Sequence, residues 1–317
     1  MLLQSVLLVI GFILLIKGSD IFVDASVGIA EKLNLPKIII GLTIVAMGTA
    51  APELVISITA SMRESNELAI GNIVGSNTFN LMFIIGLCAV IRPLVVKVKE
   101  IEKDFWLSIF AAALLLILKF LGGEYIPRTG SLLLVAIFVG YMILLIRKAL
   151  RGKIESNEPS QEDLENKKHR AMPVYILLAV FGLGMIIGGG HLTVESATFI
   201  ATALNISERV IGLTVLAVGT SLPELIISLV ACKKGECEFA LGNIIGSSIF
   251  NILFILGIAG LISPLQIDGG LIFDTAFLIV GSLIALVFVY TRKRITRVEG
   301  GIMAGMYLAY MGFAIFS

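Results

Sequence analysis

Long apolar stretches separated by short polar segments run along the whole chain. Roughly 20 residues cross the hydrocarbon core of a bilayer as a helix, and ten stretches are near that length. They are 3–28, 38–61, 68–91, 104–122, 130–147, 173–203, 210–231, 239–262, 271–291 and 299–316. The pattern predicts an all-α polytopic membrane protein with ten transmembrane helices, of which the long first and sixth helices cross at a tilt.

One extended hydrophilic stretch, Arg147–Arg170, interrupts this pattern between the fifth and sixth helices. We therefore expect a first five-helix half over 1–147, a central loop over 148–172 and a second half over 173–317. An odd number of spans makes the second half enter the membrane from the opposite side. Inverted halves with a substrate site near the midplane are a recurring build of secondary transporters.

Lys and Arg gather in the central loop and in the other loops that follow odd-numbered helices, whereas loops after even-numbered helices hold little beyond Arg63, Arg128 and Arg209. An excess of Lys and Arg marks the cytoplasmic side. The sequence therefore predicts a multi-pass protein of the cell membrane with both termini extracellular.

Composition narrows the class further. Hydrophobic residues make up 57% of the 317 residues and charged ones 15%, against about 45–50% and about 25% in soluble domains. A net charge of +1 without a long basic block gives no sign of a nucleic-acid partner.

The three cysteines are odd in number and lack metal spacing, which argues against a disulfide framework. No GxxxxGK[ST] motif is present, so any pumping is driven by an ion gradient. The apolar N-terminus is predicted to be the first span rather than a removed signal.

Two parts of the chain are near copies. Residues 41–86 and 212–257 share 24 of 46 positions at a constant offset of 171. We call residues related by this offset repeat mates. The motif GTAAPE in the first copy corresponds to GTSLPE in the second, and GNIVGSNTFN corresponds to GNIIGSSIFN.

Each copy carries one glutamate within an apolar stretch, Glu53 and Glu224. A lone intramembrane carboxylate is costly, so it needs a cationic partner or a proton and is functional by default. Neither has a Lys or Arg on its own helix face. The pair indicates a cation pathway.

The residues around these glutamates supply further oxygen atoms. Thr49, Glu53 and Ser57 are spaced by four residues and form one polar stripe on a helix. Pro52 cannot donate a backbone hydrogen bond, so carbonyls near Thr49 lose their helical partners. Free carbonyls within a membrane are tolerated where they line a cavity, and Ca²⁺ takes six to eight oxygen ligands. The repeat mates are Thr220, Pro223, Glu224 and Ser228.

Polar residues recur with the same spacing in the third and eighth helices. Asn72, Ser76 and Asn80 correspond to Asn243, Ser247 and Asn251. The serines can instead bond carbonyls of their own helix, and Asn72 and Asn243 serve equally well as clamps between helices. Glycines one position before these residues favour close helix packing.

The first and sixth helices carry charges as well. Lys17, Asp20 and Asp24 are expected to form an ion pair, and His191 and Glu195 are the repeat mates of the two aspartates. A proton-handling role for His191 and a structural one are both open. The run Gly188–Gly190 weakens the sixth helix, which fits either a gate or close packing.

These duplicated motifs resemble the alpha-repeats of the calcium/cation antiporter superfamily, and the chain is most similar to prokaryotic sodium/calcium exchangers over its whole length. The Ca²⁺/H⁺ branch places its acid in a GNxxE-type block, whereas here the acid follows GTxxP. The resemblance implies ion ligands on both halves: Ala46, Thr49, Glu53, Ser76 and Asn80, with Ala217, Thr220, Ser221, Glu224, Ser247 and Asn251. The alanines would contribute backbone carbonyls, and the first and sixth helices would act as sliding gates.

The chain departs from the family pattern at two positions. Ala50 stands where the family usually has Ser, and Asn251 where many exchangers have Asp. One hydroxyl and one carboxylate are therefore missing, which leaves the ion stoichiometry and the coupling ion open.

Two glutamates about 5 Å apart at an effective dielectric of about 20 repel by about 3 kcal/mol. One Ca²⁺, two Na⁺ or two protons would neutralise them, so the carrier would switch sides only when loaded. The hypothesis is Na⁺/Ca²⁺ exchange with no cofactor and no obligate protein partner. The alternatives are Ca²⁺/H⁺ exchange and a passive cation channel. An enzyme is disfavoured because no metal triad or nucleophile–base pair occurs in the sequence.

Overall fold

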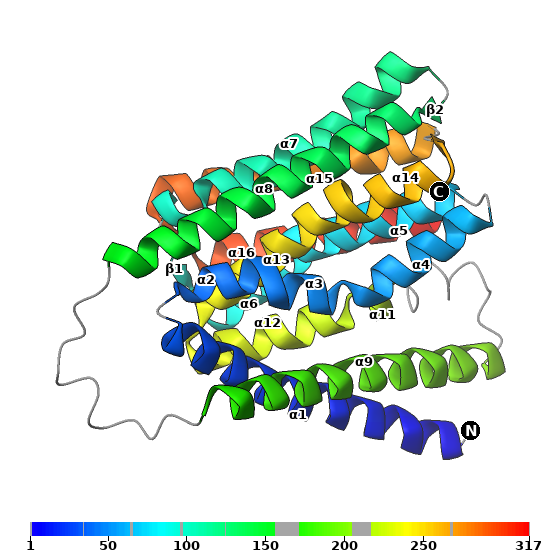
Figure 1. Cartoon of the computed structure of the whole chain (residues 1–317). Coiled ribbons are helices and arrows are strands. Elements are labelled where there is room, and N and C mark those ends of the chain that lie inside the picture. Colours follow the sequence, from blue (N-terminus) through cyan, green and yellow to red (C-terminus); the bar gives the residue numbers. More distant parts are fainter. Residues whose placement is uncertain are drawn as a thin grey trace.

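The computed structural model describes residues 2–33, 35–63, 66–95, 98–123, 125–155, 171–204, 217–266 and 269–316. Helices make up nearly all of this part of the chain, as the apolar stretches predict (Figure 1). In the first half they are α1 (Leu2–Lys32), α2 (Lys37–Ile40), the π-helix η1 (Gly41–Val45), α3 (Ala46–Thr49), α4 (Ala51–Met62), α5 (Asn66–Thr78), the π-helix η2 (Phe79–Ile84), α6 (Ile85–Ile91), α7 (Val98–Gly122) and α8 (Arg128–Glu155).

The second half repeats this order. Its helices are α9 (Met172–Ala203), α11 (Ala217–Thr220), α12 (Leu222–Lys234), α13 (Cys237–Ile249), the π-helix η4 (Phe250–Leu256), α14 (Gly257–Ile262), α15 (Gly269–Arg292) and α16 (Arg297–Phe316). Most bounds fall at the offset of 171, so Asn66–Thr78 returns as Cys237–Ile249. The sequence duplication is therefore also a duplication of elements.

Seven helices of the described residues are long and apolar enough to cross a membrane, or eight if α2–α3 and α4 form one bent span. This confirms a multi-pass membrane protein. The predicted seventh span falls partly on residues 205–216, outside the described part, and α16 is not among the seven. The number of ten spans and the side on which the termini lie stay predictions.

Helix α8 differs from its predicted end. It continues to Glu155, whereas we expected a loop from residue 148. The sequence after Arg147 is rich in Lys, Arg, Ala and Leu, which are good helix formers in water as well as in lipid. The end of an apolar stretch therefore marked the end of the predicted span but not the end of the helix.

Four short strands tie the two halves together. β1 (Leu94–Val95) pairs with β4 (Arg294–Ile295), and β2 (Tyr125–Ile126) pairs with β3 (Leu265–Gln266), both antiparallel. Each pair joins one strand of the first half to one of the second. The two pairs are thus copies of each other with the halves exchanged.

The long helices α1 and α9 cross in opposite directions along one side of the molecule (Figure 1). Glycines make this contact possible. A Cβ on Gly18 would lie 2.9 Å from the carbonyl oxygen of Gly182, and one on Gly182 would lie 2.8 Å from that of Gly18. Gly11 and Gly189 meet in the same way. Because Gly182 is the repeat mate of Gly11 and Gly189 that of Gly18, the crossing is symmetric.

The helices that carry the polar motifs lie at the centre. Within an 18-residue apolar stretch of each span, 78% is buried in Glu67–Ile91 and 83% in Cys237–Ile262, against 17% in Met172–Ile200. Helices α7 and α8 cover the central helices on one side, and α1 and α9 cover them on the other (Figure 1). The central polar residues are therefore shielded from lipid.

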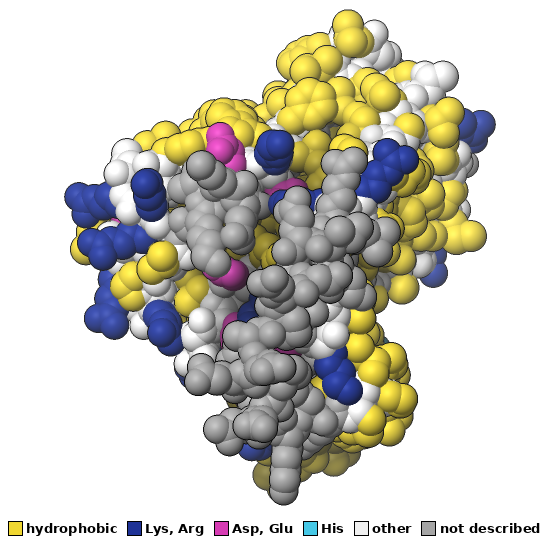
Figure 2. Space-filling view, turned by 60° about the vertical axis from the view of Figure 1, so that its left-hand side comes forward, with side chains coloured by type: hydrophobic (Ala, Val, Ile, Leu, Met, Phe, Trp, Pro, Cys, Tyr) yellow, Lys and Arg dark blue, Asp and Glu magenta, His cyan; other side chains and the backbone are white. Residues whose placement is uncertain are grey.

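The two ends of the molecule differ in character. Both termini lie at one end, and the end of α8 and the start of α9 lie at the other (Figure 1). Figure 2 brings the second end forward and shows Lys and Arg side chains gathered there, with hydrophobic side chains on the flanks. This arrangement agrees with the predicted separation of basic loops from the termini.

Candidate functional site

Two broken helices meet at the centre of the molecule. The first breaks at Ala50, where the chain bends by 49° between α3 and α4. Ala50 has φ −78° and ψ 10°, and its repeat mate Ser221 has φ −91° and ψ 9°. Pro52 and Pro223 follow at the start of α4 and α12, where the missing proline N–H interrupts no helical bond. The predicted unwinding beside Thr49 is thus found at the next residue.

The break sets both glutamates in the first turn of a helix. Glu53 belongs to the first turn of α4, and Glu224 to that of α12. Both side chains are fully buried. The N-terminus of a helix carries a partial positive charge that favours a carboxylate. Part of the cost of burying these groups is offset in this way, and the rest needs a cation or a proton.

Glu53 receives hydrogen bonds from both halves of the chain. Its Oε1 accepts from the hydroxyl of Ser221 at 3.0 Å and from that of Ser76 at 3.3 Å. Ser221 immediately precedes α12 and Glu224 lies in the first turn of that helix, so the bond from Ser221 sets the start of α12 against Glu53. The structure therefore brings the duplicated acids, predicted from separate helices, into one site.

Glu224 is held differently. The repeat mate of Ser221 is Ala50, which has no hydroxyl to donate. The repeat mate of Ser76 is Ser247, which donates to the carbonyl oxygen of Ala46 at 3.3 Å instead. Both carboxylate oxygens of Glu224 lack a hydrogen-bond partner among the described residues. The predicted loss of one hydroxyl in the first half is thus visible at Glu224.

Two asparagines extend the site from π-helical segments. Asn80 lies in η2 and Asn251 in η4, both fully buried. π-Helical turns are rare and frequent at functional sites. Within the described residues the Asn80 amide has no partner, and Asn251 donates from Nδ2 to Oδ1 of Asn77 at 3.0 Å. The Oδ1 of Asn251 is left without a donor.

Thr49 links the first half to α13. Its hydroxyl lies 3.3 Å from the carbonyl oxygen of Ala46, 3.2 Å from Oδ1 of Asn243 and 3.4 Å from the hydroxyl of Ser247. The Ala46 carbonyl, at the first residue of α3, thus faces two hydroxyls and also accepts from the backbone N–H of Ala50 at 3.1 Å.

The remaining predicted residues fall into two groups. Thr220 lines a cavity beside the site and is 7% exposed, and Ala217 begins the same short helix α11. Asn72 donates to the hydroxyl of Ser57 at 3.1 Å, and its repeat mate Asn243 donates to that of Ser228 at 3.2 Å. These two matched bonds join neighbouring helices, so the clamp role is the one that the structure displays.

Sequence reasoning missed Asn77. It lies one residue after Ser76, and its amide donates to the carbonyl oxygen of Ser248 at 3.0 Å while accepting from Asn251. The sequence held a signal for Asn77. Its repeat mate is Ser248, and this is one of the few polar positions at which the two duplicated motifs differ.

The site holds an excess of buried oxygen atoms. Of the oxygens without a hydrogen-bond partner among the described residues, five belong to the predicted ligand side chains: Oε2 of Glu53, both carboxylate oxygens of Glu224, and Oδ1 of Asn80 and Asn251. Buried acceptors are normally satisfied. No group of three His, Cys, Asp or Glu side chains that could hold a metal occurs in the described part. A cation here would be held by two carboxylates and several neutral oxygens, which suits hard ions such as Na⁺ and Ca²⁺.

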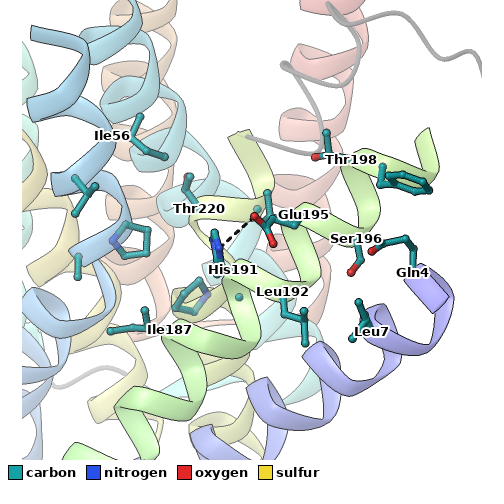
Figure 3. Close-up of a pocket in the computed structure, with 18 residues that line it drawn as sticks. Gln4, Leu7, Ile56, Ile187, His191, Leu192, Glu195, Ser196, Thr198 and Thr220 are labelled. Carbon is teal, nitrogen blue, oxygen red and sulfur yellow. Dashed lines mark ion pairs between the residues drawn. The ribbon is translucent and has the colours of Figure 1, made fainter. Parts of the chain in front are cut away.

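A cavity of about 870 Å³ leads toward this site from the end that carries the N-terminus. Its walls come from α1, α4, α9, α11 and α12, and include Gln4 near that end and the central Pro52, Thr220 and Pro223 (Figure 3). The cavity therefore reaches both helix breaks, one residue away from the buried glutamates.

Two buried carboxylates at two broken helices of a duplicated membrane protein are the arrangement expected of an ion transporter. The model of the family described as "Sodium/calcium exchanger protein" matches residues 3–147 and 174–316. The chain belongs to the sodium/calcium exchanger family.

Individual relatives agree with this assignment. The chain is 35% identical to a putative antiporter, CaxA, of Alkalimonas amylolytica, with 100% of both chains covered. It is 34% identical to the sodium/calcium exchanger MaX1 of Methanosarcina acetivorans, with 96% of both covered. Among solved structures it is similar to the sodium–calcium exchanger NCX_Mj soaked with 10 mM Na⁺ and zero Ca²⁺, with a TM-score of 0.82, 31% identity and 98% of both chains covered.

Proposed function

We propose that this protein is a secondary active antiporter that exchanges Na⁺ for Ca²⁺ across the cell membrane by alternating access. The observation that supports this most directly is the buried pair of Glu53 and Glu224, surrounded by unpartnered oxygens and without a cationic side chain bonded to them in the described part. Membership of the exchanger family supplies the ion class, since relatives carry the name sodium/calcium exchanger.

The unpartnered oxygens of the site support the ligand set that we propose. Glu53 and Glu224 neutralise the cation charge, while Asn80, Asn251 and the carbonyl of Ala46 supply neutral oxygens. We infer that the other predicted ligands, Thr49, Ser76, Ala217, Thr220, Ser221 and Ser247, contribute further oxygens. One Ca²⁺ balances both carboxylates, and so do two Na⁺.

Obligatory exchange follows from the cost of an empty site. Two uncompensated carboxylates in a dry interior face desolvation and mutual repulsion, so the closed intermediate forms only when cations are bound. We infer ten spans in two inverted halves, with both termini outside. The cavity on the N-terminal side then makes this conformation outward-facing.

The test is ⁴⁵Ca²⁺ uptake into proteoliposomes loaded with Na⁺. We expect uptake that collapses without the Na⁺ gradient, and loss of at least about 100-fold in Glu53→Gln and Glu224→Gln, because each removes a charge that the bound ion must meet. The matched control is Glu67→Gln, an exposed glutamate on α5, which should exchange normally. Normal exchange in both central variants would contradict the proposal.

A second set of uptake measurements, with Na⁺ and pH gradients imposed separately, identifies the coupling ion. Uptake driven by a pH gradient without Na⁺ would identify Ca²⁺/H⁺ exchange. Flux that needs no counter-ion would identify a passive channel. Uptake that follows the Na⁺ gradient alone supports the proposal.

A further inference from the structure

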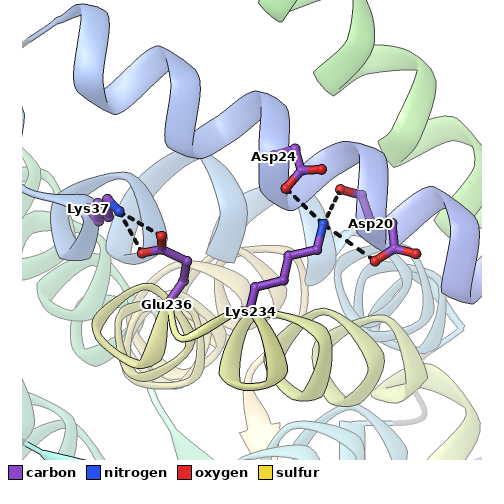
Figure 4. Close-up of polar contacts among 5 residues, drawn as sticks. All are labelled: Asp20, Asp24, Lys37, Lys234 and Glu236. Atoms are coloured by element: carbon purple, nitrogen blue, oxygen red, sulfur yellow. Dashed lines mark hydrogen bonds and ion pairs between the residues drawn. The ribbon is translucent and has the colours of Figure 1, made fainter. Parts of the chain in front are cut away.

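A network of charges closes one end of the molecule. Lys234, at the end of α12, lies 2.8 Å from Oδ1 of Asp24 and 3.4 Å from Oδ1 of Asp20, both on α1, and donates to the carbonyl oxygen of Asp20 at 3.0 Å (Figure 4). The expected ion pair of the first helix therefore forms with a lysine of the other half rather than within that helix. We call these three residues the first latch.

The duplication supplies a second set of the same kind. The repeat mate of Lys234 is Arg63, at the end of α4, and the repeat mate of Asp24 is Glu195, on α9. His191 takes the position of Asp20. We call Arg63, His191 and Glu195 the second latch.

The second latch is open in this structure. Glu195 pairs with His191 of its own helix at 3.3 Å, and both side chains are mostly exposed. Arg63 is exposed and has no ion-pair partner among the residues that the structure describes. The same residue positions are therefore joined at one end of the molecule and separated at the other.

The packing of the helices shows the same difference. Helix α1 packs along α12. The corresponding helices α9 and α4 are separated by the cavity, whose walls include His191 and Glu195 on one side and Ile56 on the other (Figure 3). The contact between α9 and α4 that would correspond to the packing of α1 on α12 is therefore replaced by the cavity.

We propose that the two latches close in turn during the transport cycle. In the conformation seen here Lys234 holds α12 against α1 and closes the end away from the termini. In the opposite conformation Arg63 bonds Glu195, α9 closes over α4, and Lys234 releases Asp20 and Asp24. This inference rests on the proposed alternating exchange. It assigns to two sets of three residues outside the ion site the task of stabilising one gate or the other.

The ion pairs of the latches are weak enough to allow both conformations. Exposed ion pairs contribute little to stability, so a latch biases the two conformations without trapping either. In inverted repeats the two halves exchange roles between the outward- and inward-facing states. Loss of one latch should therefore favour the conformation that the other latch stabilises.

The first experiment measures which end is open, by the labelling rate of two reporter cysteines with a water-soluble thiol reagent. The background carries Ala in place of Cys88, Cys232 and Cys237. Val55→Cys reports on the cavity, whose wall it forms with 64% exposure, and Ile226→Cys is its repeat mate on α12. Labelling depends on conformation alone, so it remains informative if the cargo differs from Na⁺ and Ca²⁺.

We expect Lys234→Ala to slow labelling at position 55 and to speed it at position 226, each by about two- to fivefold, the range of one exposed ion pair. Arg63→Ala should not shift the balance in that direction. Lys233→Ala, a neighbouring exposed lysine, is the matched control and should leave both rates unchanged. No change in Lys234→Ala, or changes of the same sign at both reporters, would overturn the proposal.

A second experiment tests the contact that this structure does not show. The cysteine pair Arg63→Cys with Glu195→Cys should cross-link on oxidation, protect position 55 and arrest transport until the disulfide is reduced. The pair Asp24→Cys with Lys234→Cys should cross-link and leave position 55 reactive. If position 63 fails to cross-link to 195 while 24 cross-links to 234, the second latch does not form. If both pairs cross-link but the wild-type protein shows no Na⁺/Ca²⁺ exchange, the proposed function is refuted and the latches are not.

Discussion

Asn77 and Ser248 are repeat mates and touch each other. The amide of Asn77 donates to the carbonyl oxygen of Ser248 at 3.0 Å, across a sequence separation equal to the repeat offset of 171. Two equivalent residues can be in contact only where the axis that relates the halves passes between them. The axis therefore runs through the polar centre, beside Asn251.

Other contacts between the two halves also occur in matched pairs, in which each half takes the role that the other has in the first contact. The register of Leu94 with Ile295 is matched by that of Ile126 with Leu265. At the surface of the bundle, Gly11 meets Gly189 and Gly18 meets Gly182. The helix breaks, the strands and the α1–α9 crossing thus share one pseudo-symmetry, and the structure departs from it at the hydrogen bonds of Glu53 and Glu224 and at the charge latches.

Asn77 should affect ion binding without being a predicted ligand. Its Oδ1 accepts from Asn251 and so directs the oxygen of that amide away from Asn77. Asn77→Ala removes this bond, and a buried hydrogen bond is worth about 1 kcal/mol. We expect the Na⁺ and Ca²⁺ concentrations for half-maximal exchange to rise by about five- to tenfold.

The control for this prediction is the adjacent Thr78→Val. The Thr78 hydroxyl donates to the carbonyl oxygen of Val74 on its own helix at 2.8 Å, so its loss should leave both half-maximal concentrations unchanged. Equal effects of the two variants would show that Asn77 acts through general packing.

The crossing of α1 and α9 should tolerate no added methyl group. A Cβ on residue 182 would lie within 2.9 Å of both a backbone oxygen and a backbone nitrogen of α1. Overpacking of this kind costs about 1–3 kcal/mol, so Gly182→Ala should lower the melting temperature of the purified protein and slow exchange. Gly184→Ala on the same helix meets no described atom within 4 Å and should melt at the wild-type temperature or above, because Ala favours helix.

Much of the site could be predicted because duplication and lipid restrict the chain strongly. Glu53 and Glu224 stood out since a carboxylate in an apolar stretch has few structural explanations. Pro52 and Pro223 marked the helix breaks because proline cannot donate a helical hydrogen bond. Both features depend on local sequence, and both appear in the structure where the sequence put them.

Other features depend on partners that are distant in sequence. The pairing of Lys234 with Asp24 joins residues 210 positions apart, and no local pattern distinguishes Lys234 from Lys233. The π-helical segments around Asn80 and Asn251 also escaped prediction, because their residues have ordinary helical periodicity. The end of α8 was missed because apolar length shows where a helix leaves the membrane and not where it ends.

The start of α16 should depend on a capping box. The Thr296 hydroxyl accepts from the backbone N–H of Glu299 at 3.3 Å, and Oε2 of Glu299 accepts from the backbone N–H of Thr296 at 2.8 Å. Thr296→Ala removes half of this box and should cost about 1 kcal/mol, measured as a lower melting temperature with unchanged half-maximal Na⁺ and Ca²⁺. Thr291→Ala, whose exposed hydroxyl bonds one carbonyl of its own helix, should melt close to wild type. A shift in ion dependence in Thr296→Ala would mean that α16 affects the site.

Glu53 accepts a hydrogen bond from Ser221, whereas Glu224 has no equivalent donor because position 50 is Ala. Adding or removing one hydroxyl at these two positions should change Na⁺ binding. Ser221→Ala removes the 3.0 Å bond to Glu53, and a hydrogen bond to a charged group is worth about 1.5–3 kcal/mol. If Ser221 also provides an oxygen to a bound ion, the Na⁺ concentration for half-maximal exchange should rise by about tenfold or more. Ala50→Ser adds the equivalent hydroxyl on the Glu224 side and should lower that concentration.

Steady-state exchange at varied Na⁺ measures both effects, with the Hill coefficient as a second readout. An added Na⁺ ligand in Ala50→Ser should steepen the Na⁺ dependence, whereas a simple gain in stability would leave its shape unchanged. Ser61→Ala on α4 is the matched control, since its buried hydroxyl has no partner in the described structure. Opposite shifts in Ser221→Ala and Ala50→Ser, with Ser61→Ala unchanged, would identify positions 50 and 221 as paired determinants of Na⁺ binding. Shifts in the same direction would contradict that role.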